Sequence, residues 1–223
     1  LYEAFSSPIT ERDCGLMCGP HNQRGVPFCC DISVSIPSAY CEEWAYLEAS
    51  TDLWRPWEED SHLEGQELHR HLQSGQQLIA CQGHLFCQRT YRSIACRAFP
   101  FFPYFNSQGV FLGMSYYREY RDRCWVLSHL EEVKREYIDQ FMMVFQALFD
   151  PYPRSQGEYQ GFSAWVRNQA LQEEDGLMLL TPRREAVLID PLTEAMQAVN
   201  VRDLPAFGPY DIIRKMPFPG EQK

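Results

Sequence analysis

The stretch that decides how this chain folds runs from residue 14 to residue 30 and reads CGLMCGPHNQRGVPFCC. It places four cysteines, Cys14, Cys18, Cys29 and Cys30, in a segment rich in glycine, proline and polar residues. This composition predicts a loop whose shape depends on what its thiols bind rather than on an apolar core. Thiolates at such spacings are typical ligands of soft or borderline-soft metal ions.

A second group of cysteines lies further along the chain. Cys81, Cys87 and Cys96 fall within one short segment, and Cys124 follows downstream. The ninth cysteine, Cys41, belongs to neither group. We therefore predict a metal site with eight candidate ligands: Cys14, Cys18, Cys29, Cys30, Cys81, Cys87, Cys96 and Cys124.

The number of centres stays open at this stage. Neighbouring side chains on an extended backbone point to opposite faces. Cys29 and Cys30 would therefore either serve two different centres or lie in a turn. The simpler expectation is one centre that draws on both groups of cysteines.

Two other interpretations of the nine cysteines fit less well. A disulfide framework is typical of short secreted chains with an even cysteine count, whereas this chain has 223 residues and an odd count. Free thiols buried in a core are common and account for scattered cysteines. They do not account for the adjacent pair Cys29 and Cys30 beside two more cysteines.

Composition bears on the class of partner. The chain has 20 basic and 30 acidic residues and a net charge of -10, which argues against nucleic-acid binding. The first six residues lack a basic segment followed by an apolar run, and no stretch approaches the roughly 18 apolar residues of a membrane-spanning helix. These features predict a soluble, cytoplasmic protein without a membrane partner.

Local patterns predict short elements in the first half of the chain. Residues 31–36 alternate polar and apolar side chains, which predicts a strand that Pro37 ends. Residues 39–49 are expected to form a short helix, and residues 57–72 a polar helix. Residues 99–117 predict a hairpin, because two prolines exclude a helix and a turn follows them.

The second half shows clearer signals for helix and hairpin. Ser128 and Glu131 form a capping-box pattern, and apolar residues at helical spacing continue to Asp150, which predicts a long amphipathic helix. A second helix is expected over residues 158–174 and a hairpin over residues 177–190.

We predict an α+β fold with a boundary near residue 150. Residues 1–150 would form a loop-rich, metal-bound cysteine-cluster domain with short strands and the long amphipathic helix. Residues 151–223 would form a smaller α+β C-terminal extension of a helix plus a hairpin.

The spacing Cys14-x3-Cys18-x10-Cys29-Cys30, followed by CQGHLFCQRTYRSIACRAFP over residues 81–100, resembles the YkgJ-type cysteine-cluster proteins. That family is described as zinc- or iron-chelating, and the flagellin lysine N-methylases look related to it. The most specific piece is the Cys-Arg-x-Phe-Pro run that begins at Cys96. The resemblance covers residues 14–125 and implies that the eight candidate cysteines hold an iron–sulfur cluster or zinc.

This chain departs from the family pattern in three ways. Cys41 has no counterpart in the pattern. Residues 19–28 open out the first cluster, which leaves open whether Cys18 reaches the metal. The Arg-Pro pair that usually precedes the Cys-Arg step is absent from residues 91–95.

Neighbouring residues bear on the charge of such a site. Zinc and iron–sulfur clusters both accept all-sulfur ligands, so ligand identity does not choose between them. Arg89, Arg92 and Arg97 surround the second group and either compensate thiolate charge or are solvated at the surface. His21 and His84 are candidates to replace a thiolate or to donate a hydrogen bond from outside the site.

The function expected from these features is metal binding with a structural or redox role. One alternative is a protein-modifying enzyme related to flagellin lysine N-methylase, and another is a protein-interaction module with a purely structural zinc. The sequence shows no Gly-x-Ser-x-Gly, P-loop or His-Glu-x-x-His motif, and no glycine-rich turn between a strand and a helix. The expected partners are a metal ion and a protein.

Overall fold

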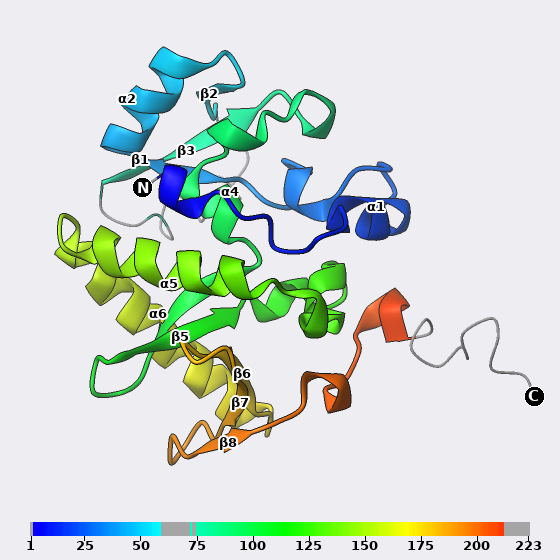
Figure 1. Ribbon diagram of the computed structural model, residues 1–223, viewed down its shortest axis with the longest axis vertical. Helices are drawn as coiled ribbons and strands as arrows, with labels where there is room; N and C mark the ends of the chain where they lie inside the picture. Colours follow the sequence, from blue (N-terminus) through cyan, green and yellow to red (C-terminus); the bar gives the residue numbers. More distant parts are fainter. Residues whose placement is uncertain (1, 59–71, 73–74, 212–223) are drawn as a thin grey trace, which may run out of the picture.

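Two antiparallel sheets organise the computed structural model, which describes residues 2–58, 72 and 75–211 (Figure 1). The smaller sheet has the strand order β1-β3-β2, and the larger has the order β4-β5-β6-β7-β8. The strands are β1 (Ser38–Tyr40), β2 (Trp54–Pro56), β3 (Gln76–Cys81), β4 (Phe101–Phe105), β5 (Phe111–Tyr116), β6 (Leu177–Leu180), β7 (Ala186–Ile189) and β8 (Met196–Ala198). The expected α+β class is confirmed.

The helices differ greatly in length. Two long helices, α5 and α6, follow each other, whereas the cysteine-bearing segments form single turns. The α-helices are α1 (Cys14–Cys18), α2 (Cys41–Ser50), α4 (Ile94–Ala98), α5 (Arg135–Phe149) and α6 (Pro153–Gln172). The 3-10 turns are η1 (Glu3–Phe5), η2 (Gly19–His21), η3 (Phe28–Cys30), η4 (His84–Phe86), η5 (Arg89–Tyr91), η6 (Arg118–Tyr120), η7 (Trp125–Ser128), η8 (Leu130–Glu132), η9 (Val201–Asp203) and η10 (Gly208–Tyr210).

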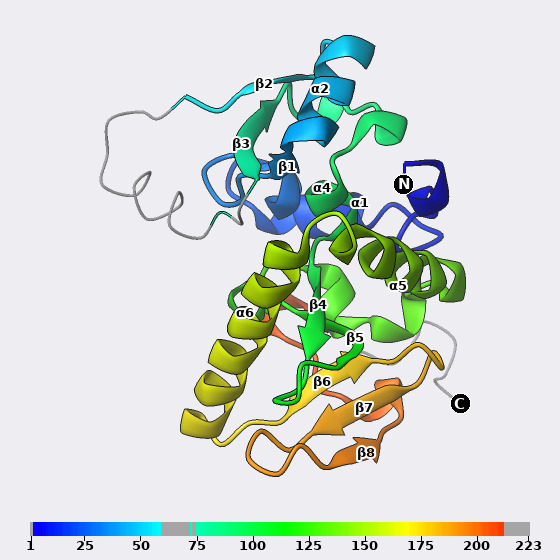
Figure 2. The same ribbon diagram turned by 90° about the vertical axis from the view of Figure 1, so that its left-hand side faces the viewer.

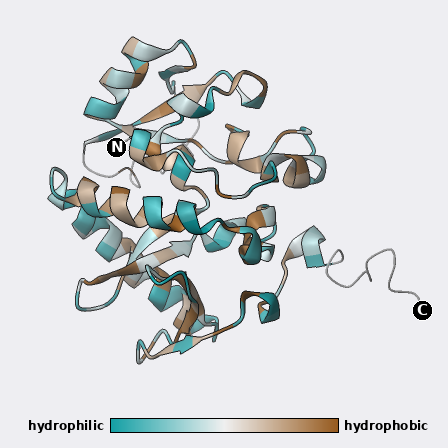
Figure 3. Ribbon diagram, in the orientation of Figure 1, coloured by the Kyte–Doolittle hydropathy of each residue, from teal (hydrophilic) through white to brown (hydrophobic). Residues whose placement is uncertain are grey.

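Both faces of the larger sheet are covered, which is why all five residues of β4 are buried. Side chains alternate between the two faces of a strand. Phe101 and Phe105 pack in the core with α5, whereas Phe102 and Tyr104 pack with residues of α6 such as Val166. Figure 2 shows β4 between the two helices, and Figure 3 shows apolar residues along β6 and β7.

The N-terminal segment lies on α5. The Phe5 ring packs 5.4 Å from that of Tyr137 and 6.2 Å from that of Phe141, measured between ring centroids. The backbone N–H of Lys134 donates to the carbonyl of Ile9 at 2.8 Å. Residues near the two ends of the cysteine-rich half therefore share one core.

The smaller sheet and α2 enclose a separate core. Leu47 of α2, Leu53, Trp54 of β2 and Ile79 of β3 are buried together. Cys81 and Cys96 pack against this cluster. The small sheet thus fixes the positions of two predicted ligands.

Several predicted elements are confirmed. The helix expected over residues 39–49 is α2, and that over residues 158–174 lies within α6, which begins earlier, at Pro153. The hairpin expected over residues 99–117 is β4 and β5, and that over residues 177–190 is β6 and β7. The polar helix expected over residues 57–72 falls largely on residues outside the described part of the chain.

The strand predicted over residues 31–36 is wrong. The Asp31 carboxylate accepts hydrogen bonds from the backbone N–H and the hydroxyl of Ser33. The backbone carbonyl of Asp31 accepts hydrogen bonds from the N–H groups of Val34 and Ser35. An Asp side chain that bonds its own downstream backbone favours a turn over a strand.

The predicted start of the long helix is also wrong. Residues before α5 form 3-10 turns, and the helix begins at Arg135. The Ser128 hydroxyl accepts from the backbone N–H of Phe207 at 2.8 Å instead of capping a helix.

The boundary that we predict near residue 150 falls between α5 and α6. The larger sheet takes β4 and β5 from before this point and β6, β7 and β8 from after it. The two predicted parts therefore share a sheet. Within the described residues, no helix is long and apolar enough to cross a membrane.

Gly113 lets β5 and β6 approach each other. A Cβ atom at this position would lie 2.4 Å from the carbonyl oxygen of Leu180, and the backbone φ is 155°. We expect Gly113→Ala to lower the free energy of unfolding by about 2 kcal/mol, the scale of core overpacking, as measured by urea denaturation. Gly157→Ala is the matched control, because Gly157 is exposed within α6 with open space around it. That control should be neutral or stabilising by up to about 1 kcal/mol, and equal effects of the two changes would contradict the prediction.

Candidate metal centre

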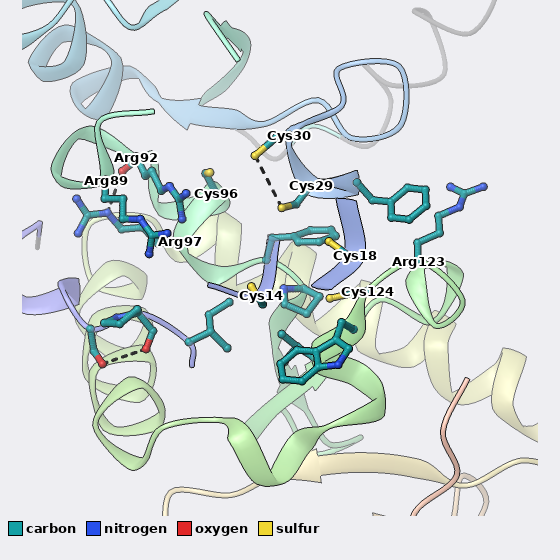
Figure 4. Close-up of a pocket in the computed structure, with 18 of the residues that line it drawn as sticks. Cys14, Cys18, Cys29, Cys30, Arg89, Arg92, Cys96, Arg97, Arg123 and Cys124 are labelled. Atoms are coloured by element: carbon teal, nitrogen blue, oxygen red, sulfur yellow. Dashed lines mark hydrogen bonds between the residues drawn. The ribbon is translucent and has the colours of Figure 1, made fainter. Parts of the chain in front are cut away.

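All eight predicted ligands line two adjoining pockets (Figure 4). The first pocket, with a cavity of about 180 Å³, is lined by Cys14, Cys18, Cys29, Cys30, Cys96 and Cys124. The second, of about 150 Å³, is lined by Cys29, Cys30, Cys81, Cys87 and Cys96. Cys41 lines neither of them and is exposed at the start of α2. All nine cysteines lie in the described part of the chain and all are free thiols.

The first two cysteines lie on one helical turn. The Asp13 side chain caps α1 by accepting the backbone N–H of Gly15 at 3.0 Å. Residues four apart on a helix share a face, so Cys14 and Cys18 lie on the same side. The loop expected for residues 14–30 thus contains a helical turn that orients two thiols.

The insertion at residues 19–28 does not separate Cys18 from the later pair. The chain folds back on itself, because the buried Asn22 amide donates to the Asp31 carboxylate at 3.0 Å and Arg24 pairs with the same carboxylate at 3.3 Å. Cys18 and Cys29 line the same pocket as a result.

The adjacent pair lies in a turn rather than on an extended strand. Residues of η3 follow a 3-10 path in which the N–H of Cys30 donates to the carbonyl of Pro27 at 2.8 Å. The Cys29 and Cys30 sulfur atoms are 3.9 Å apart. Both residues consequently line both pockets.

Cys81 and Cys87 of the second group lie at the end of β3 and after a tight turn. Cys81 is the last residue of β3, and Gly83 adopts a φ of 99° that favours glycine. The 3-10 turn η4 then leads directly to Cys87. This reversal places both thiols at the second pocket.

Cys96 is held by α4. The buried Ser93 hydroxyl caps this helix by accepting the N–H of Cys96 at 3.2 Å. The Glu43 carboxylate, which is also buried, accepts the N–H of Ile94 at 2.6 Å and the hydroxyl of Tyr2 at 2.6 Å. These contacts tie Cys96 to α2 and to the N-terminal segment.

Cys124 closes the first pocket from the other side of the fold. Its backbone N–H donates to the carbonyl of Tyr120 at 2.8 Å. The buried Tyr210 donates its hydroxyl hydrogen to the neighbouring Arg123 carbonyl at 2.8 Å. The C-terminal part of the described chain therefore helps to position this thiol.

The three arginines predicted to compensate thiolate charge have different partners. Arg92 donates from its Nε to the Cys87 sulfur at 3.1 Å and lines both pockets. Arg89 pairs with the Asp13 carboxylate at 2.6 Å. Arg97 donates to the backbone carbonyls of four residues, which are Tyr2, Phe5, Thr90 and Arg92. Direct contact with a thiol is thus found for Arg92, whereas Arg97 binds backbone.

The thiols differ in their readiness to ionise. A hydrogen bond from Cys29 lowers the pKa of Cys30 to about 7, although burial opposes this. Burial raises the pKa of Cys18 to about 11 and that of Cys96 to about 12. Cys30 is therefore the member of the adjacent pair that ionises more readily, and a metal ion would have to displace protons from Cys18 and Cys96.

The two histidines named as candidate ligands lie in different places. His84 lines the second pocket beside Cys81 and Cys87. His21 is exposed, lines neither pocket, and packs edge-on against the Tyr210 ring at 5.3 Å between centroids.

The distances between the thiols determine which kind of metal group they could bind without moving. Among the described residues, no three His, Cys, Asp or Glu side chains form a group arranged to hold a metal ion. Four sulfurs at about 2.3 Å from one zinc ion lie about 3.8 Å apart, a separation that the Cys29 and Cys30 sulfurs match. The donor chemistry fits a thiophilic metal, but to bind one ion the thiols would have to move closer together, whereas a larger inorganic group would need less movement.

Sequence reasoning missed the residues that shape the site without offering thiols. Glu43 and Asp31 are buried acids: Glu43 accepts the backbone N–H of Tyr40, and Asp31 accepts the side-chain amide of Asn22. Asp31 directly follows the Cys29-Cys30 pair, and this position beside Ser33 was the available signal for a turn. The contact of Glu43 with Ile94 had no local signal, because the two residues are 51 positions apart.

Comparisons with known proteins add no relative. No family model matches the chain. No curated protein and no solved structure matches it either. The resemblance to YkgJ-type proteins therefore depends on the cysteine motifs alone.

Proposed function

We propose that this protein binds a thiophilic metal centre through the cysteines of the two adjoining pockets, with a structural or redox role. One observation carries the proposal: the eight cysteines singled out by spacing gather at one place, and the ninth lies elsewhere.

An iron–sulfur cluster suits the spacing better than a single zinc ion. A cluster distributes its thiolate ligands over several iron atoms, so the sulfurs lie further apart than around one ion. The first pocket, with a cavity of about 180 Å³, offers room for such a group, and the Cys29 and Cys30 sulfurs lie 3.9 Å apart at its lining. When bound, the cluster would supply electron transfer or hold the loops together. Zinc in a structural site is the second candidate.

The lysine-methylase alternative gains less support from the pocket. Sites for drug-sized organic molecules have volumes of about 300–1,000 Å³, whereas the larger pocket has about 180 Å³. Its polar lining consists mainly of thiols and arginines, with aromatic and aliphatic side chains around them. This lining suits an inorganic group better than a peptide lysine and a methyl donor.

Anaerobic purification followed by metal analysis tests the proposal. A brown sample with broad absorbance near about 400 nm, from sulfur-to-iron charge transfer, together with bound iron and sulfide, supports the cluster. A colourless sample that releases zinc supports the structural ion instead. A protein that contains neither, and that takes up neither after reconstitution with iron and sulfide or with zinc, refutes metal binding.

Alkylation gives an independent prediction for the same site. In the metal-loaded protein, iodoacetamide should modify Cys41 readily, because it is exposed and lies outside the pockets. The eight pocket cysteines should react at least about tenfold more slowly than in protein from which a chelator has removed the metal, since bound thiolates are blocked as nucleophiles. Mass spectrometry of peptides measures each rate. Equal rates at Cys87 or Cys96 with and without metal would remove those residues from the ligand set.

A further inference from the structure

Cys29 and Cys30 hold their sulfur atoms close together on one short turn. The two sulfurs are 3.9 Å apart, and Figure 4 shows them facing each other across the dashed line. Both residues line both pockets, and both are partly exposed rather than buried. Two neighbouring thiols at the wall of a cavity are well placed to be joined by an oxidant.

Other cysteines of the pockets are less well placed for such a bond. The Cys18 sulfur donates to a backbone carbonyl of α1 at 3.8 Å, and the Cys87 sulfur accepts from Arg92 at 3.1 Å. Cys81 and Cys96 lie on β3 and α4, so a disulfide between them would pull one element towards the other. The adjacent pair needs no such movement, because no long loop has to be closed.

We propose that the Cys29-Cys30 pair is an oxidative modification site, at which hydrogen peroxide converts the two thiols into a disulfide and so removes both from the metal-binding set. The disulfide itself follows from the placement of the two sulfurs. Its effect on a metal rests on the proposed function.

The oxidation consumes one hydrogen peroxide molecule and two thiols. One thiol, as its thiolate, attacks a peroxide oxygen; the O–O bond breaks, a sulfenic acid forms, and the departing hydroxide takes up the thiol proton to leave as water. The second thiol attacks the sulfenic sulfur; the S–O bond breaks, the S–S bond forms, and a second water leaves. The pair thus loses two electrons and two protons, and the peroxide gains them.

Both pockets are large enough to admit this oxidant. Their cavities are about 180 Å³ and about 150 Å³. A water molecule occupies about 30 Å³ in the liquid, and hydrogen peroxide is larger than water by a single oxygen atom. The oxidant therefore reaches the Cys29-Cys30 pair from either cavity.

A disulfide between adjacent residues is easy to reduce. The peptide bond that joins Cys29 and Cys30 is trans, so their Cα atoms lie about 3.8 Å apart. Disulfides usually join Cα atoms about 4.4–6.8 Å apart, and departures from this range store strain that favours reduction. Strained disulfides are typically the labile or regulatory ones. We therefore expect a dithiol to reverse the modification.

Oxidation of metal-free protein tests the disulfide. The full-length Cys41→Ser variant is used, because no Lys or Arg separates Cys30 from Cys41 and trypsin would leave the three thiols in one peptide. A chelator removes metal, an equimolar amount of hydrogen peroxide is added without air, and the remaining thiols are alkylated before digestion. By mass spectrometry, we expect the peptide with Cys29 and Cys30 to lose two hydrogen atoms and take up no alkyl group. Dithiothreitol should restore alkylation of both thiols.

Single variants show whether the two thiols act as a pair. In Cys29→Ser and in Cys30→Ser, the remaining thiol should stop at the sulfenic acid, which dimedone captures. Cys14→Ser is the matched control, since it also removes one thiol of the first pocket, and it should form the disulfide as before. The inference is overturned if peroxide preferentially joins other cysteines, or if it oxidises Cys29 or Cys30 of the unsubstituted pair without joining them.

Release of zinc measures the consequence for metal binding. Zinc(II) has no redox chemistry of its own, so its release by peroxide reports oxidation of the ligands. In zinc-loaded protein, we expect release to rise in step with the Cys29-Cys30 disulfide, and zinc to bind again after reduction. A disulfide that forms while all the zinc stays bound would overturn the coupling. A chain that takes up neither zinc nor iron fails the proposed function alone, because the metal-free experiment decides the disulfide separately.

Discussion

If the proposed metal is bound, we expect its removal to lower the free energy of unfolding by several kcal/mol, because residues 11–30 and 81–92 bury few of their side chains. Of residues 11–30, all of which the structure describes, only Cys18, Gly19 and Asn22 are buried. Residues 81–92 are likewise all described, and none of them is buried. In small peptides a structural zinc ion supplies about 10 kcal/mol or more of folding free energy.

Limited proteolysis of the chelated protein measures this effect directly. Cleavage should begin within residues 11–30 and 81–92, and α5 and α6 should resist longer because they pack mainly on the larger sheet. Cys96→Ser should lower metal content and give the same cleavage pattern without chelator, whereas Cys41→Ser should match the wild type. Unchanged resistance in both the chelated protein and Cys96→Ser would show that metal does not support these segments.

We expect Arg97→Ala to lower the free energy of unfolding by about 3 kcal/mol, the scale of hydrogen bonds to a charged group that are lost together. Its guanidinium donates to four backbone carbonyls and lies 4.5 Å from the centroid of the Tyr2 ring. These contacts join the N-terminal segment to α4, which carries Cys96. The arginine of the Cys-Arg-x-Phe-Pro run therefore stabilises the fold by binding the backbone of several segments.

Arg89→Ala is the matched control for this change. Arg89 also lines the first pocket, but its pair with Asp13 is about half exposed on both sides, at 54% and 47%. Exposed pairs contribute about 0–1 kcal/mol. Arg97→Lys should recover only part of the loss, because an ammonium lacks the planar fork that reaches several carbonyls. Urea denaturation measures the free energy of unfolding of all three variants. Equal losses for Arg97→Ala and Arg89→Ala would show that the backbone contacts of Arg97 do not stabilise the fold.

The sequence was informative wherever a pattern is local. The apolar spacing that continues to Asp150 and the hairpin pattern over residues 177–190 are short-range signals, and α5 and the β6–β7 hairpin follow them. The start of α5 escaped prediction because the Ser128 hydroxyl bonds Phe207, 79 residues away. Likewise, the pairing of Met114 with Leu180 joins strands whose spacing in sequence carries no register.

The candidate site likewise has a part that local sequence patterns predict and a part that they do not. Cysteine type and spacing identify which thiols gather, because closely spaced thiols are typical of metal sites. How they gather depends on tertiary contacts such as that between Glu43 and Ile94, which no local pattern encodes. The turn at η3, which brings the Cys29 and Cys30 sulfurs together, was one of two options that the sequence left open.

The contact between Phe5 and Phe141 has a consequence for synthesis on the ribosome. At about 5–20 residues per second, the stretch of chain that separates these two rings takes on the order of 10 s to translate. Over this interval all the cysteines up to Cys124 are synthesised, while α5, against which the N-terminal turn packs, is still incomplete. We therefore expect the proposed metal to bind most easily during translation, before α5 packs against Phe5.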